Sequence, residues 1–162
     1  MNKLFIFLFY FFLLNNSYSQ TAKSIEIIAD EMEWNKQKNE ALALGNAKAT
    51  KGDTVITANK IIGTLTNTSK DQKIIKLIAL GKVRFTRMGE VATGEKAIYD
   101  LEKDIIVIKG NVSLKKNENI MAGESLIINL NTGLSKLSGS NNNNKVKMKY
   151  NTKNWILNET IK

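Results

Sequence analysis

The pattern of apolar and polar residues changes near residue 20. Residues 4–14 form one unbroken apolar run, whereas later apolar residues alternate with polar ones or come in short β-branched groups. Alternation with a period of two, bounded by Gly, Asn or Asp, is typical of strands with one buried face. We therefore expect an all-β structure without helices after the run. The clearest expected strands are residues 24–30, 54–59, 104–114 and 126–130.

Polar turn residues separate these strands. Turns are expected at residues 51–53, 88–90, 116–119 and 131–133, and they depend on Gly, Asn and Asp because the chain has no Pro. Short strands with a turn every 8 to 12 residues or so predict a sandwich, barrel or roll.

Two short elements repeat along the chain and alternate with each other. The first is a Gly followed two residues later by a small apolar residue; its glycines, with Gly139 as a fourth, are 36, 29 and 29 residues apart. A recurring Gly inside a strand marks a bulge or bend, and a repeated unit indicates a shared core. We therefore predict a long antiparallel sheet that folds over at the glycines, with an open edge at each end. The first element occurs at Gly45, Gly81 and Gly110, and the second, a small residue before Asp, Asn or Gly, at Ala29-Asp30, Ala58-Asn59, Thr93-Gly94 and Ala122-Gly123.

The N-terminal segment has the features of a secretory signal peptide. Lys3 precedes the apolar run of 11 residues, and Ser17 and Ser19 have the spacing that signal peptidase prefers. We predict cleavage after Ser19 and export of the mature chain. The alternative is a membrane anchor, but a spanning helix needs about 20 apolar residues, roughly twice the length of this run.

Composition narrows the possible chemistry. The 162 residues suit one domain, and they include no Cys and no His, which removes thiol catalysis, thiolate metal sites and the commonest general base. We therefore predict that the protein is not an enzyme and uses no metal or cofactor. The acids that catalysis would need fall at expected turns or strand ends, where Asp stabilises the bend through its own backbone. They are Asp30, Asp53, Asp100 and Asp104.

The chain is basic, with a formal net charge of +9. For an exported protein the available polyanions are phosphorylated lipids and surface glycans. The basic residues are spread along the chain, so a solubilising surface remains the alternative. Lys48, Lys82, Arg84 and Arg87 are candidates for attracting lipid phosphates, although a solvated strand face is the more common role of such residues.

The order and spacing of these motifs resemble the OstA-like (LptA) family. The residues that carry the resemblance are Ile25 to Asp30, the Gly-Asn-small elements at Gly45 and Gly110, Gly94-Glu95-Lys96-Ala97-Ile98-Tyr99-Asp100, the strand from Asp104 to Val112, and Gly123-Glu124-Ser125-Leu126. Each motif is weak alone, but together they cover residues 25–150, nearly the whole mature chain. The Asn141–Asn144 run and the segment around Trp155 depart from the family pattern.

The resemblance implies an open, twisted antiparallel β-jellyroll of about 16 short strands, a number that comes from the family and not from the strand pattern. It also implies a periplasmic carrier that holds the acyl chains of lipid A in an apolar trough. Such carriers stack head to tail with copies of themselves, with inner-membrane LptC-like domains and with outer-membrane LptD-like domains. The expected domain is residues 20–150, followed by a frayed tail of residues 151–162.

Period-two alternation and the resemblance together propose the lipid-binding residues. The resemblance singles out five of them, and it implies that the Tyr99 ring lies against acyl chains with its hydroxyl at a polar rim. Apolar alternation by itself more often means a closed core, in which Tyr99 is a packing residue with a satisfied hydroxyl. The five are Ile25, Ile27, Phe85, Tyr99 and Leu101, and the others are Ile56, Val83, Ala97, Ile106, Ile108, Val112, Leu114, Leu126 and Ile128.

Two other functions remain open at this point. A membrane-anchored LptC-like component would share the fold, and it differs in retaining its N-terminal segment. A secreted glycan-binding β-solenoid or carbohydrate-active enzyme would need aromatic platforms or paired carboxylates, and the chain has only two Trp residues.

Overall fold

The computed structural model describes residues 24–66, 72–140 and 145–150, and the secondary structure within these ranges is entirely β. The predicted signal peptide, the Asn141–Asn144 run and the predicted tail lie outside the described residues. No described segment forms a helix that could cross a membrane. The ten strands are β1 (Ile25–Ile28), β2 (Glu31–Asn35), β3 (Glu40–Lys51), β4 (Thr54–Leu65), β5 (Ile74–Arg87), β6 (Glu90–Asp100), β7 (Ile105–Lys116), β8 (Asn119–Asn129), β9 (Ser135–Ser138) and β10 (Lys147–Lys149).

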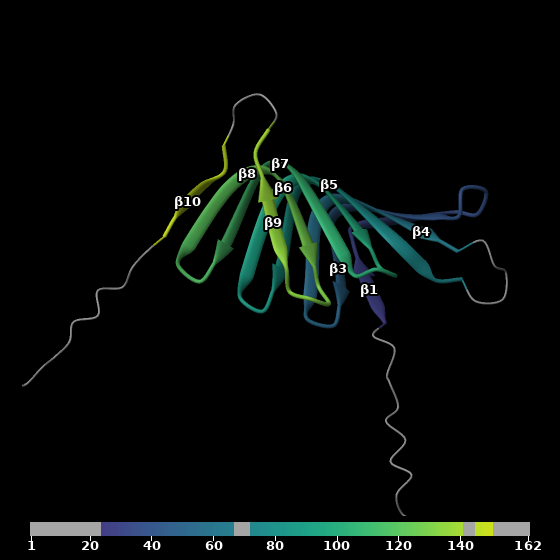
Figure 1. Ribbon diagram of the computed structural model, residues 1–162. Coiled ribbons are helices and arrows are strands. Elements are labelled where there is room, and N and C mark those ends of the chain that lie inside the picture. The colour runs from purple at the N-terminus through teal and green to yellow at the C-terminus, as the bar shows by residue number, and fades with distance from the viewer. Residues whose placement is uncertain (1–23, 67–71, 141–144, 151–162) are drawn as a thin grey trace, which may run out of the picture.

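All ten strands belong to one antiparallel sheet. From β3 to β8 each strand pairs with its neighbour in the sequence, whereas two short strands share each end of this series. At one end β1 and β2 pair with different parts of β3, and at the other β9 and β10 pair with different parts of β8. Figure 1 shows the result, a folded-over sheet with β10 at one end and the N-terminal strands at the other.

The long strands bend where the sequence predicts. At Gly45, Gly81 and Gly110 two consecutive residues on one strand face a single residue on the next, so that a β-bulge interrupts the register. Each of these glycines, and the residue that follows it, has a positive φ. Because L-residues adopt this conformation at a cost, Gly at the first position lowers the strain of the bend.

The bends divide the sheet into two leaves that face each other. Six of the ten strands bend, so each consists of two straight halves, and with the four short strands they make 16 straight segments. This architecture confirms the predicted open antiparallel jellyroll. The β1 leaf contains β1, β10 and residues 47–51, 54–57, 83–87, 90–93, 112–116 and 119–123; the β2 leaf contains β2, β9 and residues 40–44, 60–65, 74–80, 96–100, 105–109 and 125–129.

A polar side chain covers each bulge glycine. A Cβ atom at Gly45, Gly81 or Gly110 would lie within 3 Å of Asp30, Asn59 or Glu95, respectively. In the third repeat the covering residue is Glu95, which comes one residue after the Thr93-Gly94 element. The reason is that the covering residue is defined by its position opposite the bulge and not by its amino-acid type.

Candidate functional site

The predicted lipid-binding residues all face the space between the two leaves. Ile25, Ile27 and Leu101 are half-buried and pack against the core. The other eleven belong to the buried core: Ile56, Val83, Phe85, Ala97, Tyr99, Ile106, Ile108, Val112, Leu114, Leu126 and Ile128. The predicted facing is therefore confirmed. Their contact with lipid stays a prediction, because in this conformation their side chains fill the interior.

The interior also contains residues outside the predicted set, and for Ile61 and Leu65 the reason is that the alternation changes phase within β4. On β4 the buried positions are even-numbered up to Ala58 and odd-numbered from Ile61, and Asn59 at the bend causes this shift. A one-residue shift moves every later side chain to the other face. The additional core residues are Ala43, Ala47, Ala49, Ala58, Ile61, Leu65, Leu77, Ala79, Ala92 and Leu130.

The register joins the interior residues into two apolar rows that cross all the strands of each leaf. We call them the β1 track and the β2 track after their leaves. In the middle of the roll both tracks are buried, and at its ends they reach exposed residues, Met148 for the β1 track and Met32 for the β2 track. The β1 track is Ile27, Ala49, Ile56, Phe85, Ala92, Leu114, Met121 and Met148; the β2 track is Met32, Ala43, Ile61, Ala79, Ala97, Ile108, Leu126 and Leu137.

At the N-terminal end the two leaves line an apolar cavity of about 310 Å³ that is partly open to solvent. Trp34 and Met32 line it and are 54% and 56% exposed, although large apolar side chains are usually buried. Neither residue was among the predicted lipid-binding residues, although Met32 and Trp34 alternate with Glu31 and Glu33 in the period-two pattern of a strand. The other lining residues are Ile25, Ile27, Glu33, Ala41, Leu42, Ala43 and Ile74.

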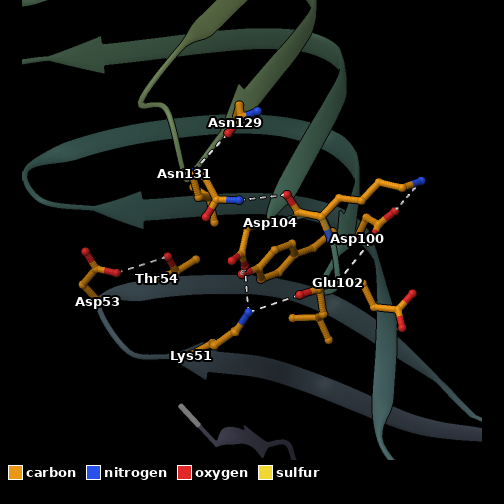
Figure 2. Close-up of polar contacts among 12 residues, drawn as sticks. Lys51, Asp53, Thr54, Asp100, Glu102, Asp104, Asn129 and Asn131 are labelled. Atoms are coloured by element: carbon orange, nitrogen blue, oxygen red, sulfur yellow. Dashed lines mark hydrogen bonds and ion pairs between the residues drawn. The ribbon is translucent and has the colours of Figure 1, made fainter. Parts of the chain in front are cut away.

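A polar cluster lies where the free hairpin ends of the two leaves meet (Figure 2). Lys51, at the end of β3, donates hydrogen bonds to the Asp104 carboxylate (2.7 Å) and the Leu101 carbonyl (3.3 Å). The hydroxyl of Tyr99 donates to the same Asp104 oxygen at 2.8 Å. The Lys51 ammonium also lies 5.5 Å from the centre of the Tyr99 ring, within reach of a cation–π interaction. The hydrogen bond from the Tyr99 hydroxyl to Asp104 agrees with the expected polar rim. The burial of Tyr99 agrees with the alternative, in which Tyr99 is a packing residue with a satisfied hydroxyl.

Arg87 makes a second polar connection in this cluster. Its guanidinium donates to the Asp53 carboxylate at 3.1 Å and to the Leu130 carbonyl at 2.9 Å. A polar cavity of about 140 Å³ lies between these groups and the Lys51–Asp104 pair. The other three basic residues proposed for phosphate attraction, Lys48, Lys82 and Arg84, are exposed on the outer surface.

The cluster shifts the pKa of two of its members. Burial raises the pKa of Tyr99 well above its ordinary value, and the hydrogen bond to Asp104 adds to the rise. Partial burial pushes the pKa of Asp104 upward, but hydrogen bonds from Lys51 and Tyr99 outweigh it, so the net shift is downward. The carboxylate therefore stays ionised and the phenol neutral across the neutral range.

The four acids considered for catalysis have structural partners. Asp100 accepts hydrogen bonds from the backbone amides of Glu102 and Lys103, as expected for a turn residue. Asp30 accepts from the Asn46 amide at 2.9 Å. Asp53 and Asp104 belong to the polar cluster at the hairpin ends, which their positions at turns did not predict. Among the described residues no group of three or more acids has a geometry that could hold a metal ion.

The chain is similar to proteins of lipopolysaccharide transport. Residues 26–134 match the family described as "LptA/(LptD N-terminal domain) LPS transport protein". An uncharacterised protein of Rhizobium meliloti (strain 1021) is 29% identical over 119 residues, or 70% of this chain and 64% of that protein, so the chain spans just under two thirds of this relative. The crystal structure of LptH, the LptA homologous periplasmic component of the conserved lipopolysaccharide transport device from Pseudomonas aeruginosa, superposes with a TM-score of 0.69; it is 15% identical, and the match covers 80% of this chain and 96% of LptH.

Proposed function

This chain belongs to the family of LptA and LptD N-terminal-domain lipopolysaccharide transport proteins, and from that premise we propose that it is a periplasmic carrier and not an enzyme. It holds the acyl chains of lipid A between its two leaves and passes them along the roll. The predicted signal peptide, cleaved after Ser19, delivers the domain of residues 20–150 to the periplasm.

The continuity of the β1 and β2 tracks is the observation that carries this proposal. A protein that needs only a stable core has no reason to extend its apolar rows to exposed positions such as Met32 and Met148 at the two ends. An acyl chain gains about 0.8 kcal/mol for each CH₂ group that leaves water. Two unbroken apolar tracks provide such a surface along the whole roll, and the leaves separate to admit the chains.

Site-specific photo-crosslinking tests the lipid path. A photo-reactive amino acid at Phe85, which lies on the β1 track and is fully buried, is expected to attach to lipopolysaccharide in cells. The same amino acid at the neighbouring Arg84, which faces outward, is expected to give no adduct. The adduct is detected as a lipopolysaccharide-positive band after gel electrophoresis. A folded, exported protein that gives no adduct at Phe85 contradicts the proposal.

The exposed ends of the tracks also support stacking. Within the described residues the sheet path ends at β1 and β10, so both edges can accept another strand, and each apolar track ends beside such an edge. Another copy of this chain, an LptC-like domain or an LptD-like domain would each continue the sheet and the tracks. The proposed assembly is therefore a head-to-tail bridge from the inner to the outer membrane.

Charge at the N-terminal end is expected to weaken this stacking. In Trp34→Glu a carboxylate replaces an apolar side chain of the cavity wall, and burying it against a neighbour would cost several kcal/mol. The variant should shift sedimentation profiles toward the monomer, while Met88→Glu, at a 79% exposed position in the β5–β6 hairpin, should leave them unchanged. Equal behaviour of the two variants would argue against contact through this end.

A further inference from the structure

The two leaves are joined in very different ways along their two long sides. On one side every long strand runs through a bend from one leaf into the other, so the connection is covalent. On the opposite side the leaves end in separate hairpins. We call the line where these hairpin ends meet the seam.

Among the described residues, the Lys51 and Arg87 side chains connect the leaves across the seam. Lys51, in the β3–β4 hairpin of the β1 leaf, binds Asp104 and the Leu101 carbonyl in the β6–β7 hairpin of the β2 leaf. Arg87, in the β5–β6 hairpin of the β1 leaf, binds the Leu130 carbonyl in the β8–β9 turn of the β2 leaf. The seam is thus held by cations of one leaf and oxygen acceptors of the other.

These contacts are adjacent to the apolar interior. Tyr99 links the two regions, because its ring is 2% exposed and belongs to the core while its hydroxyl binds Asp104. Thr54 and Leu130 line the polar cavity at the seam and are also buried. An acyl chain that entered from the side would pass between Lys51 and Asp104 and then meet the Tyr99 ring.

We propose that the seam is the lateral entrance of the roll and that Lys51, Asp104 and Arg87 form a latch that holds it closed when no lipid is bound. This inference rests on the proposed carrier function and adds the route of entry and the residues that control it. Ion pairs at such partly exposed sites contribute little stability, because water and salt screen them. The latch therefore holds the two leaves together without blocking their separation.

Reversible cross-linking of the seam tests the latch. Since the chain contains no Cys, Lys51→Cys and Asp104→Cys together create a unique pair across the seam, which a short, reducible bifunctional thiol reagent can join. The matched control is Lys116→Cys with Glu90→Cys, because the Lys116–Glu90 ion pair joins neighbouring strands of the β1 leaf alone. Both proteins are then incubated with fluorescently labelled lipopolysaccharide, and circular dichroism verifies that each retains its β structure.

The latch predicts that the cross-linked seam protein binds lipopolysaccharide only at background level and recovers binding when the cross-link is reduced. The control protein should bind equally well before and after reduction. Undiminished binding by the cross-linked seam protein would overturn the latch while leaving the carrier function intact. Failure of the reduced protein and of the unsubstituted chain to bind would instead overturn the carrier function, and the latch with it.

Single substitutions give a second readout that needs no cross-link. Lys51→Gln weakens the latch, so we expect labelled lipopolysaccharide to load about two- to fivefold faster, the effect of losing one partly exposed ion pair. Lys116→Gln should load at the original rate. Equal rates for the two variants would contradict a latch at Lys51.

Discussion

Replacing Phe85 with Ala is expected to lower the free energy of unfolding by about 3–5 kcal/mol, the range for large-to-small changes at aromatic core positions. Phe85 has no exposed surface and lies on the β1 track between Ile56 and Ala92 of the adjacent strands. Its loss would leave a cavity in the middle of the β1 leaf, where the bends restrict how far the neighbours can collapse. Equilibrium unfolding in urea measures the change.

The neighbouring Arg84→Ala is the control for this experiment. Arg84 lies on the same strand, faces outward and is exposed, so its replacement should change stability by less than about 0.5 kcal/mol. The comparison of the two variants also tests whether the interior is closely packed when no lipid is bound. If Phe85→Ala costs no more than Arg84→Ala, the leaves are apart in solution and the interior is not closely packed without lipid.

The second large effect is expected at the bends. Gly110→Ala should destabilise the protein by about 2–4 kcal/mol, because Ala resists a positive φ and because the new methyl group displaces a hydrogen-bonded side chain. The φ of Gly110 is 84°, and a Cβ atom there would lie 2.7 Å from the Glu95 carboxylate. That carboxylate accepts a 2.6 Å hydrogen bond from the Asn111 amide, which the displacement would break.

Gly89→Ala separates the conformational cost of a positive φ from the cost of displacing a hydrogen-bonded side chain. Gly89 has a similar φ of 79°, but nothing lies within 4 Å of a Cβ atom at this turn position. Only the conformational cost remains, so the loss should be about 1–2 kcal/mol. Thermal unfolding of both variants makes the comparison. Equal losses would show that the polar cover of the bulge contributes nothing to the bend.

The fold was largely predictable because its determinants are local. Period-two alternation identified parts of β1, β4, β7 and β8 as the clearest strands, and turn residues located the β3–β4, β5–β6 and β7–β8 hairpins and the β8–β9 turn. The glycines of the first repeat located the bends, since a positive φ favours Gly wherever it occurs. Each of these features depends on residues a few positions apart.

The contacts across the seam and the apolar cavity at the N-terminal end could not be predicted from the sequence. Lys51 and Asp104 are 53 residues apart and carry no pattern that pairs them. Their contact depends on how far the sheet twists and on which hairpin of one leaf meets which hairpin of the other. Trp34 is a similar case, because its role in the cavity wall follows from the placement of β1 and β2 on opposite leaves at this end of the roll.

The sequence by itself determined an all-β antiparallel sheet that bends at its glycines and the side chains that face inward on most strands, and the family resemblance implied the open jellyroll. The first two properties follow from backbone preferences and hydrophobic periodicity, which act over short distances along the chain. Only the tertiary structure decided that the interior is closed, that both tracks run unbroken to the ends, and that polar side chains hold the seam. Those properties depend on strand register and on the angle between the leaves, because bulges change the register and the twist accumulates from strand to strand.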